Sequence, residues 1–145
     1  MKYVIDCSSA MKWELPEPDS ANAIRLRDEY RNGIHELLAP DIFPAEVGSA
    51  ALVSERKGRI GPGQFPIIVA DILKSCPILH ETGRLIPPAC RIIASITTGF
   101  RMSFYDALYV ALAEREGCEL VTGDDKLLRN AGGQDPFIIS VSALP

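Results

Sequence analysis

Four acidic residues stand at positions where side chains of an α/β protein meet, and together they could bind a divalent cation. Asp6 ends the first apolar run, Asp124 follows a later one, and Glu46 and Asp106 lie in the first turns of predicted helices. Two carboxylates about 5 Å apart repel each other by roughly 3 kcal/mol at an effective dielectric constant near 20. A cluster of four therefore predicts either protonated acids or a cation among them.

The donor types of this cluster indicate the metal and the reaction. Carboxylate oxygens suit Mg²⁺ or Mn²⁺, whereas zinc prefers nitrogen and sulfur. The two histidines, His35 and His80, are far apart in the chain and are predicted to be structural or surface residues. An ion held by carboxylates activates water and stabilises charge on a phosphodiester, so phosphodiester hydrolysis is the candidate reaction. The sequence contains no nucleotide-binding glycine loop and no serine nucleophile elbow.

Each acid also has a structural explanation of its own. Asp6 and Asp124 are suited to cap following helices. Ser103 and Asp106 fit a capping box, and Glu46 fits an ordinary surface position of a helix. Capping explains the acids one at a time, but it does not explain why all four recur at the carboxyl ends of strands, where ligands of open α/β sheets bind.

The elements that must position these acids follow from the hydrophobic pattern. Short apolar runs alternate with longer segments of helical period, which predicts an α/β fold, a three-layer α/β/α sandwich with a central, mostly parallel sheet of about five strands. Strands are predicted at residues 2–6, 36–39, 77–80, 119–122 and 137–141. Helices are predicted at residues 21–32, 42–57, 64–74, 88–98 and 103–116, with Asp41 capping the second and the last one buried.

Composition limits the class of protein. The chain has 145 residues, of which 47% are hydrophobic and 23% charged, so residues 1–145 are predicted to form one globular domain. No apolar stretch is long enough to cross a bilayer and Asp6 comes too early for a signal peptide, so we expect a cytoplasmic protein without a membrane partner. With a formal net charge of −4, a polyanionic substrate must be held locally. The cysteines, expected to be buried and reduced, are Cys7, Cys76, Cys90 and Cys118.

Four blocks of this sequence resemble the PIN domain family, and more narrowly VapC-type toxins of bacterial toxin–antitoxin pairs. The blocks begin at Asp6 (DCSSAMKW), Pro44 (PAEV), Tyr105 (YDALY) and Val121 (VTGD). Their order and spacing span nearly the whole chain. The resemblance implies a Mg²⁺- or Mn²⁺-dependent ribonuclease that forms a homodimer and is inhibited by a cognate antitoxin.

The resemblance also implies roles for single residues. Asp6, Glu46, Asp106 and Asp124 match the acidic quartet of the family, and Ser8 and Thr122 match the hydroxyl positions that support it. We expect Asp6 and Asp106 to bind the metal directly. Glu46 and Asp124 bind it through water or position the attacking water, and the sequence does not divide these tasks.

The sequence departs from the family pattern at two positions. Ser49 stands where many relatives carry an amide, and Asp125 stands where a basic residue is common. These departures keep open an alternative function, a PIN-like binding module without catalysis. A phosphoacceptor receiver domain is a weaker alternative, because Asp6 has no adjacent acidic partner.

Contacts with substrate and partners are less marked in the sequence. Lys12 is predicted to be exposed, and Trp13 either packs in the core or faces a partner. Two basic groups are candidates for phosphate contacts, with locally paired helix faces as the alternative. They comprise Arg25, Arg27 and Arg31 in one helix and Arg56, Lys57 and Arg59 near the end of another.

Overall fold

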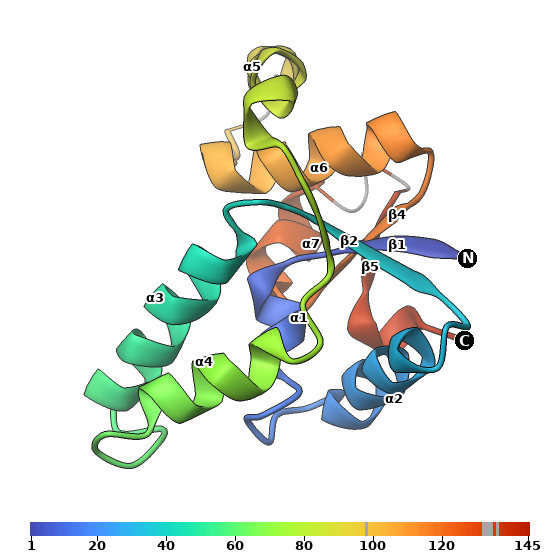
Figure 1. The fold of residues 1–145 in the computed structure, drawn as a ribbon. Helices are drawn as coiled ribbons and strands as arrows, with labels where there is room; N and C mark the ends of the chain where they lie inside the picture. The colour runs from blue at the N-terminus through green and yellow to red at the C-terminus, as the bar shows by residue number, and fades with distance from the viewer. Residues whose placement is uncertain (98, 132–134, 136) are drawn as a thin grey trace.

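A five-stranded parallel sheet forms the centre of the fold (Figure 1). The computed structural model describes residues 1–97, 99–131, 135 and 137–145. The strand order is β3-β2-β1-β4-β5, and every neighbouring pair is parallel. The strands are β1 (Lys2–Ile5), β2 (Glu36–Pro40), β3 (Ile78–His80), β4 (Glu119–Thr122) and β5 (Ile138–Ser140).

Helices cover both faces of this sheet, which confirms the predicted α/β sandwich. In the view of Figure 1, α5 and α6 lie above the sheet and α1 to α4 lie below it. The α-helices are α1 (Cys7–Met11), α2 (Ser20–Arg31), α3 (Phe43–Arg56), α4 (Phe65–Leu73), α5 (Ile86–Ser95), α6 (Phe104–Glu116) and α7 (Asp125–Ala131). Two 3₁₀ helices, η1 (Thr82–Leu85) and η2 (Val141–Ala143), complete the described structure.

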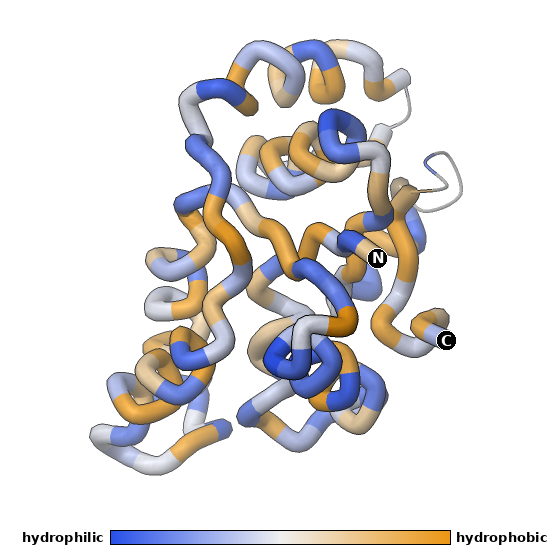
Figure 2. The backbone as a smooth tube through the Cα atoms, turned by 45° about the vertical axis from the view of Figure 1, so that its right-hand side comes forward, coloured by the Kyte–Doolittle hydropathy of each residue, from blue (hydrophilic) through white to orange (hydrophobic). Residues whose placement is uncertain are grey.

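The core lies where the sheet meets these helices. Tyr3, Val4 and Ile5 of β1 are all buried, as expected for a parallel strand covered on both sides. Helix α6 packs on β1, β2 and β4, and every residue from Ala107 to Ala113 is buried. In Figure 2 the strands are mostly hydrophobic, whereas α2 alternates between hydrophobic and hydrophilic residues. Among the described residues, no helix has the length and apolar character needed to cross a bilayer.

The strand order creates a switch point between β1 and β4. From β1 the chain runs to β2 and then β3 on one side, whereas β4 and β5 lie on the other side of β1. Ligands of open α/β sheets bind at the carboxyl ends of strands at such a point, because the connecting segments diverge there. Ile5 pairs in register with Val121, so Asp6, which follows β1, lies at the level of Thr122 at the end of β4.

Several local expectations need correction. The helix expected at 88–98 begins two residues earlier and ends at Ser95, and Thr98 lies outside the described residues. Asp41 does not cap α3; its Oδ1 instead accepts hydrogen bonds from the backbone N–H and hydroxyl of Thr82. The expected burial of the cysteines is wrong as well: all four are free, but Cys90 is exposed and the other three are only partly buried.

Candidate active site

Asp6 is held rigidly at the end of β1. The residue is only 7% exposed, and its carboxylate accepts three hydrogen bonds. Oδ1 accepts from the Ser8 hydroxyl at 2.6 Å and from the Ser9 backbone N–H at 3.0 Å, and Oδ2 accepts from the Thr122 hydroxyl. The bond from Ser9 makes Asp6 the N-cap of α1, so the capping role expected for this acid is confirmed. Asp6 therefore caps α1 and belongs to the candidate site with the same carboxylate.

The two supporting hydroxyls tie β4 to this acid. Ser8 Oγ accepts a hydrogen bond from the Gly123 backbone N–H at 2.9 Å, and Thr122 Oγ1 accepts one from the Asp124 backbone N–H at 3.0 Å. The carboxylate of Asp124 in turn accepts hydrogen bonds from the backbone N–H groups of Lys126 and Leu127 at the start of α7. One continuous network thus fixes the ends of both strands at the switch point.

Asp106 and Glu46 reach this end of the sheet from helices. Ser103 Oγ accepts a hydrogen bond from the Asp106 backbone N–H at 3.0 Å, which starts α6 so that Asp106 lies in its first turn. Glu46 lies in the first turn of α3, and its Oε1 accepts a 2.7 Å hydrogen bond from the hydroxyl of Tyr109. Tyr109 belongs to the buried helix α6, so this bond links the two helices across the site.

Burial raises the pKa values of three of these acids, and repulsion by neighbouring acids adds to the shift of two of them. Burial raises the pKa of Asp6, although its hydroxyl and amide donors oppose the shift. Burial also raises the pKa of Glu46, with the charges of Asp6 and Asp106 adding to the shift and the Tyr109 hydroxyl opposing it. The pKa of Asp106 rises to about 6, first through burial and then through the charge of Asp6, with a further contribution from Asp124. The charges of Asp6 and Asp106 therefore act on Glu46, and those of Asp6 and Asp124 act on Asp106.

The donor chemistry of this cluster fits a hydrated divalent cation. In the described part of the chain, no three His, Cys, Asp or Glu side chains are grouped so that they could hold one metal ion directly. A shell made by all four carboxylates is therefore not preformed. Mg²⁺ binds through one or two carboxylates, keeps several waters and takes further oxygens from substrate phosphates. Asp6 and Asp106, whose charges lie close enough to interact, could supply one or two such carboxylates.

Lys12 is buried, which corrects the prediction that it is exposed. Only 8% of this residue is accessible, and its ammonium group donates hydrogen bonds to Glu17 at 3.2 Å and to the Pro18 carbonyl at 3.0 Å. Its side chain runs directly past Gly123, where a Cβ atom would lie 2.5 Å from Lys12 Cε and 3.2 Å from the Ser8 carbonyl oxygen. Gly123 therefore leaves the space that the lysine occupies beside the site.

We expect Gly123→Ala to destabilise the protein by about 1–2 kcal/mol, because the added methyl group overpacks this point. The double variant Gly123→Ala/Lys12→Ala removes the nearest clash and should lose less stability than the two single variants added together. Urea denaturation of the four proteins measures the coupling. Strictly additive losses would show that the lysine does not occupy this space in solution.

Sequence reasoning missed several residues that shape the site. Ser9 bonds Asp6 through its backbone and Val121 through its hydroxyl, and Tyr109 orients Glu46. The role of neither residue could be predicted, because the sequence position of a serine in a short helix or of a tyrosine in a buried helix does not indicate which side chain it will contact. A hollow of about 580 Å³ also opens beside Glu46, and Tyr105, which is 58% exposed, forms part of its wall.

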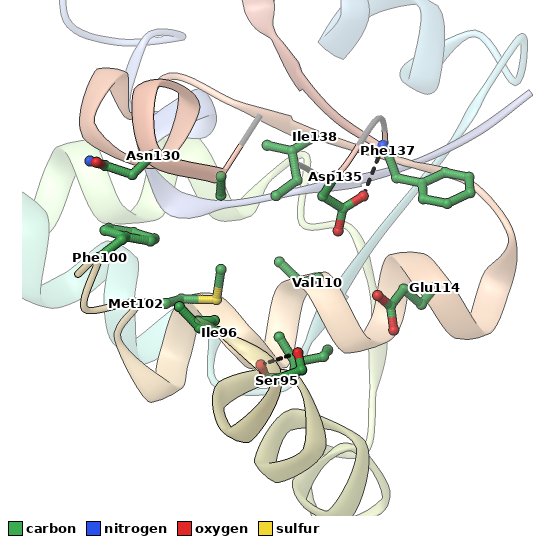
Figure 3. A pocket seen from close by; sticks show the side chains of 12 residues that line it. Ser95, Ile96, Phe100, Met102, Val110, Glu114, Asn130, Asp135, Phe137 and Ile138 are labelled. Carbon is green, nitrogen blue, oxygen red and sulfur yellow. Dashed lines mark hydrogen bonds between the residues drawn. The ribbon is translucent and has the colours of Figure 1, made fainter. Parts of the chain in front are cut away.

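Another hollow lies apart from the four acids. It occupies about 360 Å³ between α5, α6, α7 and β5, and its apolar wall includes Met102, Val110 and Ile138 (Figure 3). None of the four predicted acids lines it.

The arginines expected to contact phosphate in α2 have local partners instead. Arg27 forms an ion pair with Asp28, Arg31 donates a hydrogen bond to Ser75, and Arg25 bonds the carbonyl of Pro145. Trp13 packs in the core, where it is 6% exposed. The alternatives of locally paired arginines and a core tryptophan are therefore the ones that the structure favours.

Comparison with known proteins identifies relatives of similar length. A ribonuclease, VapC1 of Mycobacterium tuberculosis, is 32% identical over 119 residues, which cover 77% of this chain and 79% of the relative; it matches equally in strains CDC 1551 and H37Rv.

Two solved structures have a similar fold. PAE2754 of Pyrobaculum aerophilum superposes with a TM-score of 0.62 at 23% identity, covering 98% of this chain and 93% of the other. VapBC2 of Rickettsia felis, bound to a DNA fragment from its promoter, gives a TM-score of 0.65 at 17% identity, with 97% of each chain covered.

The family model of the PIN domain matches residues 3–133, a range that contains all four acids and both supporting hydroxyls. Together with the parallel sheet and the similarity to VapC1, this match shows that the chain belongs to the PIN domain family.

Proposed function

We propose that this protein is a Mg²⁺- or Mn²⁺-dependent endoribonuclease that hydrolyses phosphodiester bonds of RNA. The observation that carries the proposal is the electrostatic coupling of Asp6, Glu46 and Asp106 at the switch point between β1 and β4. Three carboxylates that repel one another are costly to fold unless a cation offsets their charge. The ribonuclease activity in the name of the similar VapC1 supports the same reaction.

The roles of the residues follow from their contacts. Asp6 and Asp106 are proposed to hold the metal, Asp6 with its orientation fixed by Ser8 and Thr122. Glu46, oriented by the Tyr109 hydroxyl, is proposed to accept a hydrogen bond from the attacking water and to align it. Asp124 uses one oxygen to cap α7. Its other oxygen is proposed to accept a hydrogen bond from a water in the site.

A bound Mg²⁺ or Mn²⁺ ion would lower the pKa of water and neutralise charge that develops on the phosphodiester.

The proposed biological role is that of the toxin in a toxin–antitoxin pair. VapBC2, whose fold this chain shares, is named as a complex of two components, which supports an antitoxin as partner. We further propose that residues 1–145 act as one domain, that two copies form a homodimer, and that the reaction takes place in the cytoplasm.

The direct test is cleavage of RNA by the purified chain without an antitoxin. Single-stranded RNA should be cut internally in millimolar Mg²⁺ or Mn²⁺, and EDTA should stop the reaction. Restored cleavage on adding excess metal controls for damage by the chelator. Equal cleavage with and without EDTA would refute the metal dependence.

A second candidate function is a PIN-like module that binds RNA or protein without cutting. It is favoured by the lack, among the described residues, of three acids grouped closely enough to hold an ion directly. Titration calorimetry with Mn²⁺ separates the two functions: a nuclease should bind Mn²⁺ at millimolar concentration or tighter, and a module of this kind should not.

A further inference from the structure

A basic hollow of about 620 Å³ lies between the segment that precedes α6 and helix α7. Its wall consists of six residues, three of them cationic and none acidic. They are Gly99, Phe100, Arg101, Lys126, Arg129 and Asn130. Phe100 and Asn130 also line the neighbouring apolar hollow, where Figure 3 shows both side chains.

The three cations of this hollow have no salt bridge to any acid that the structure describes, although the charge of Lys126 acts on Asp106. Most other basic side chains have a partner: Lys12 pairs with Glu17, Arg27 with Asp28 and Lys74 with Asp71. Within the described ranges, none of the cations in the hollow forms an ion pair, and all three residues are exposed. In a protein of net charge −4, this leaves a local concentration of positive charge.

The basic hollow adjoins the candidate active site. The Lys126 backbone N–H donates a 2.9 Å hydrogen bond to Asp124 Oδ1. Burial and the charge of Asp6 raise the pKa of Asp106, and the ammonium charge of Lys126 opposes part of that rise, so the cation lies near this acid. By contrast, Arg56 lies about 15 Å further along α3 than Glu46, at 1.5 Å per residue. Arg25 lies beside Tyr3 and His35, at the amino ends of the strands. Of the basic groups considered, this one is therefore positioned beside the acids.

We propose that the hollow between Arg101 and Arg129 binds a backbone phosphate of the RNA strand, next to the phosphodiester that is cut. The proposal rests on the proposed function for the identity of the strand. Guanidinium groups present paired N–H donors that match phosphate oxygens, and they stay charged at any physiological pH. A phosphate held here would draw the polyanion toward an acidic cluster that otherwise repels it.

The test measures RNA binding separately from cleavage. Fluorescence anisotropy with a labelled single-stranded RNA is measured on Asp106→Asn protein, in about 50 to 300 mM KCl. Adding Arg101→Gln or Arg129→Gln should weaken binding roughly five- to tenfold at the lowest salt, and the slope of log K against log salt should shrink by about 0.7 per lost contact. Arg56→Gln, an equal change of charge on an exposed arginine of α3, should leave binding unchanged within about twofold.

The outcomes separate this inference from the proposed function. Unchanged RNA affinity in both arginine variants overturns the phosphate site, whatever the cleavage assay gives. The same arginine variants are also titrated with polyglutamate. If they lose affinity for polyglutamate but not for RNA, the phosphate site is overturned and the hollow is assigned to an acidic protein segment. If the wild-type chain binds RNA through these arginines but does not cut it, the phosphate site stands and the nuclease function fails. In an active enzyme, Arg129→Gln should raise KM with little change in kcat.

Discussion

Replacing Asp106 by asparagine is expected to slow RNA cleavage by about a hundred- to a thousandfold, without unfolding the protein. The amide keeps the size of the side chain but removes the charge that interacts with both Asp6 and Asp124. Loss of one metal-binding or charge-stabilising group in an active site costs roughly 3–4 kcal/mol of transition-state stabilisation, which corresponds to this factor. Initial rates of cleavage at saturating Mn²⁺ measure the effect.

Asp125 supplies the matched control for this experiment. It is also an aspartate at the start of a helix, but it is exposed and belongs to none of the hydrogen bonds that join β1 and β4. Asp125→Asn should therefore cleave RNA at nearly the wild-type rate.

Asp6→Asn should be as inactive as Asp106→Asn but less stable, because an amide cannot accept all three hydrogen bonds that Asp6 receives. Equal activity of Asp106→Asn and Asp125→Asn would remove Asp106 from the site.

In the absence of metal, the same Asp106→Asn substitution is expected to stabilise the protein at neutral pH. Asp106 has a pKa of about 6 in the folded chain, raised by burial and by the charge of Asp6, against 3.8 for a free side chain. A shift of roughly 2 units corresponds to roughly 3 kcal/mol, and solvent screening of this partly exposed group reduces it to about 2 kcal/mol. Asparagine carries no charge and avoids that cost.

The sign of the pH dependence follows from the same shift. Because the folded protein holds this proton more tightly than the unfolded chain does, the contribution is present below pH 4 and is lost as the pH rises through about 6. The free energy of unfolding of wild type, relative to Asp106→Asn, should therefore fall between about pH 4 and pH 7 in EDTA. Denaturant unfolding at several pH values measures this difference. Millimolar Mn²⁺ should raise the Tm of wild type more than that of the variant, since a bound ion stabilises the folded state. A flat difference across this pH range would show that folding does not raise the pKa of Asp106.

Such a gain in stability on losing a charge is the opposite of what a purely structural acid would give. Asp124 illustrates the contrast, because its carboxylate accepts two backbone hydrogen bonds at the start of α7. Removing a cap of this kind costs about 1 kcal/mol. The capping explanation considered for each acid is thus correct for Asp6 and Asp124, and it does not compete with a role in the site. One oxygen can cap a helix while the other faces the cluster.

The sequence alone was sufficient to predict the layers of the fold and the ends of the sheet at which the acids lie. Strands and helices leave different hydrophobic patterns in a sequence. A parallel strand that is buried on both faces is a continuous apolar run, as in Tyr3, Val4 and Ile5, whereas a helix repeats its apolar residues every three or four positions. The four acids stand directly after such runs or at helix starts, so their convergence follows from parallel strand order. The short helix α1 was anticipated only from the capping residue Asp6 and not from periodicity, because five residues are too few to show a helical period.

Only the tertiary structure decided how side chains from distant segments meet. Lys12 carries no sequence signal for burial, yet its chain fits the space left by Gly123. Arg101 and Arg129 belong to different segments and form one basic hollow only because α7 packs beside the residues that precede α6. The local hydrophobic pattern indicates whether a side chain points to the core or to solvent. Interactions between charges, including ion pairs, depend instead on distances between segments that the fold brings together. The acidic cluster was therefore visible in the sequence, and the basic hollow beside it was not.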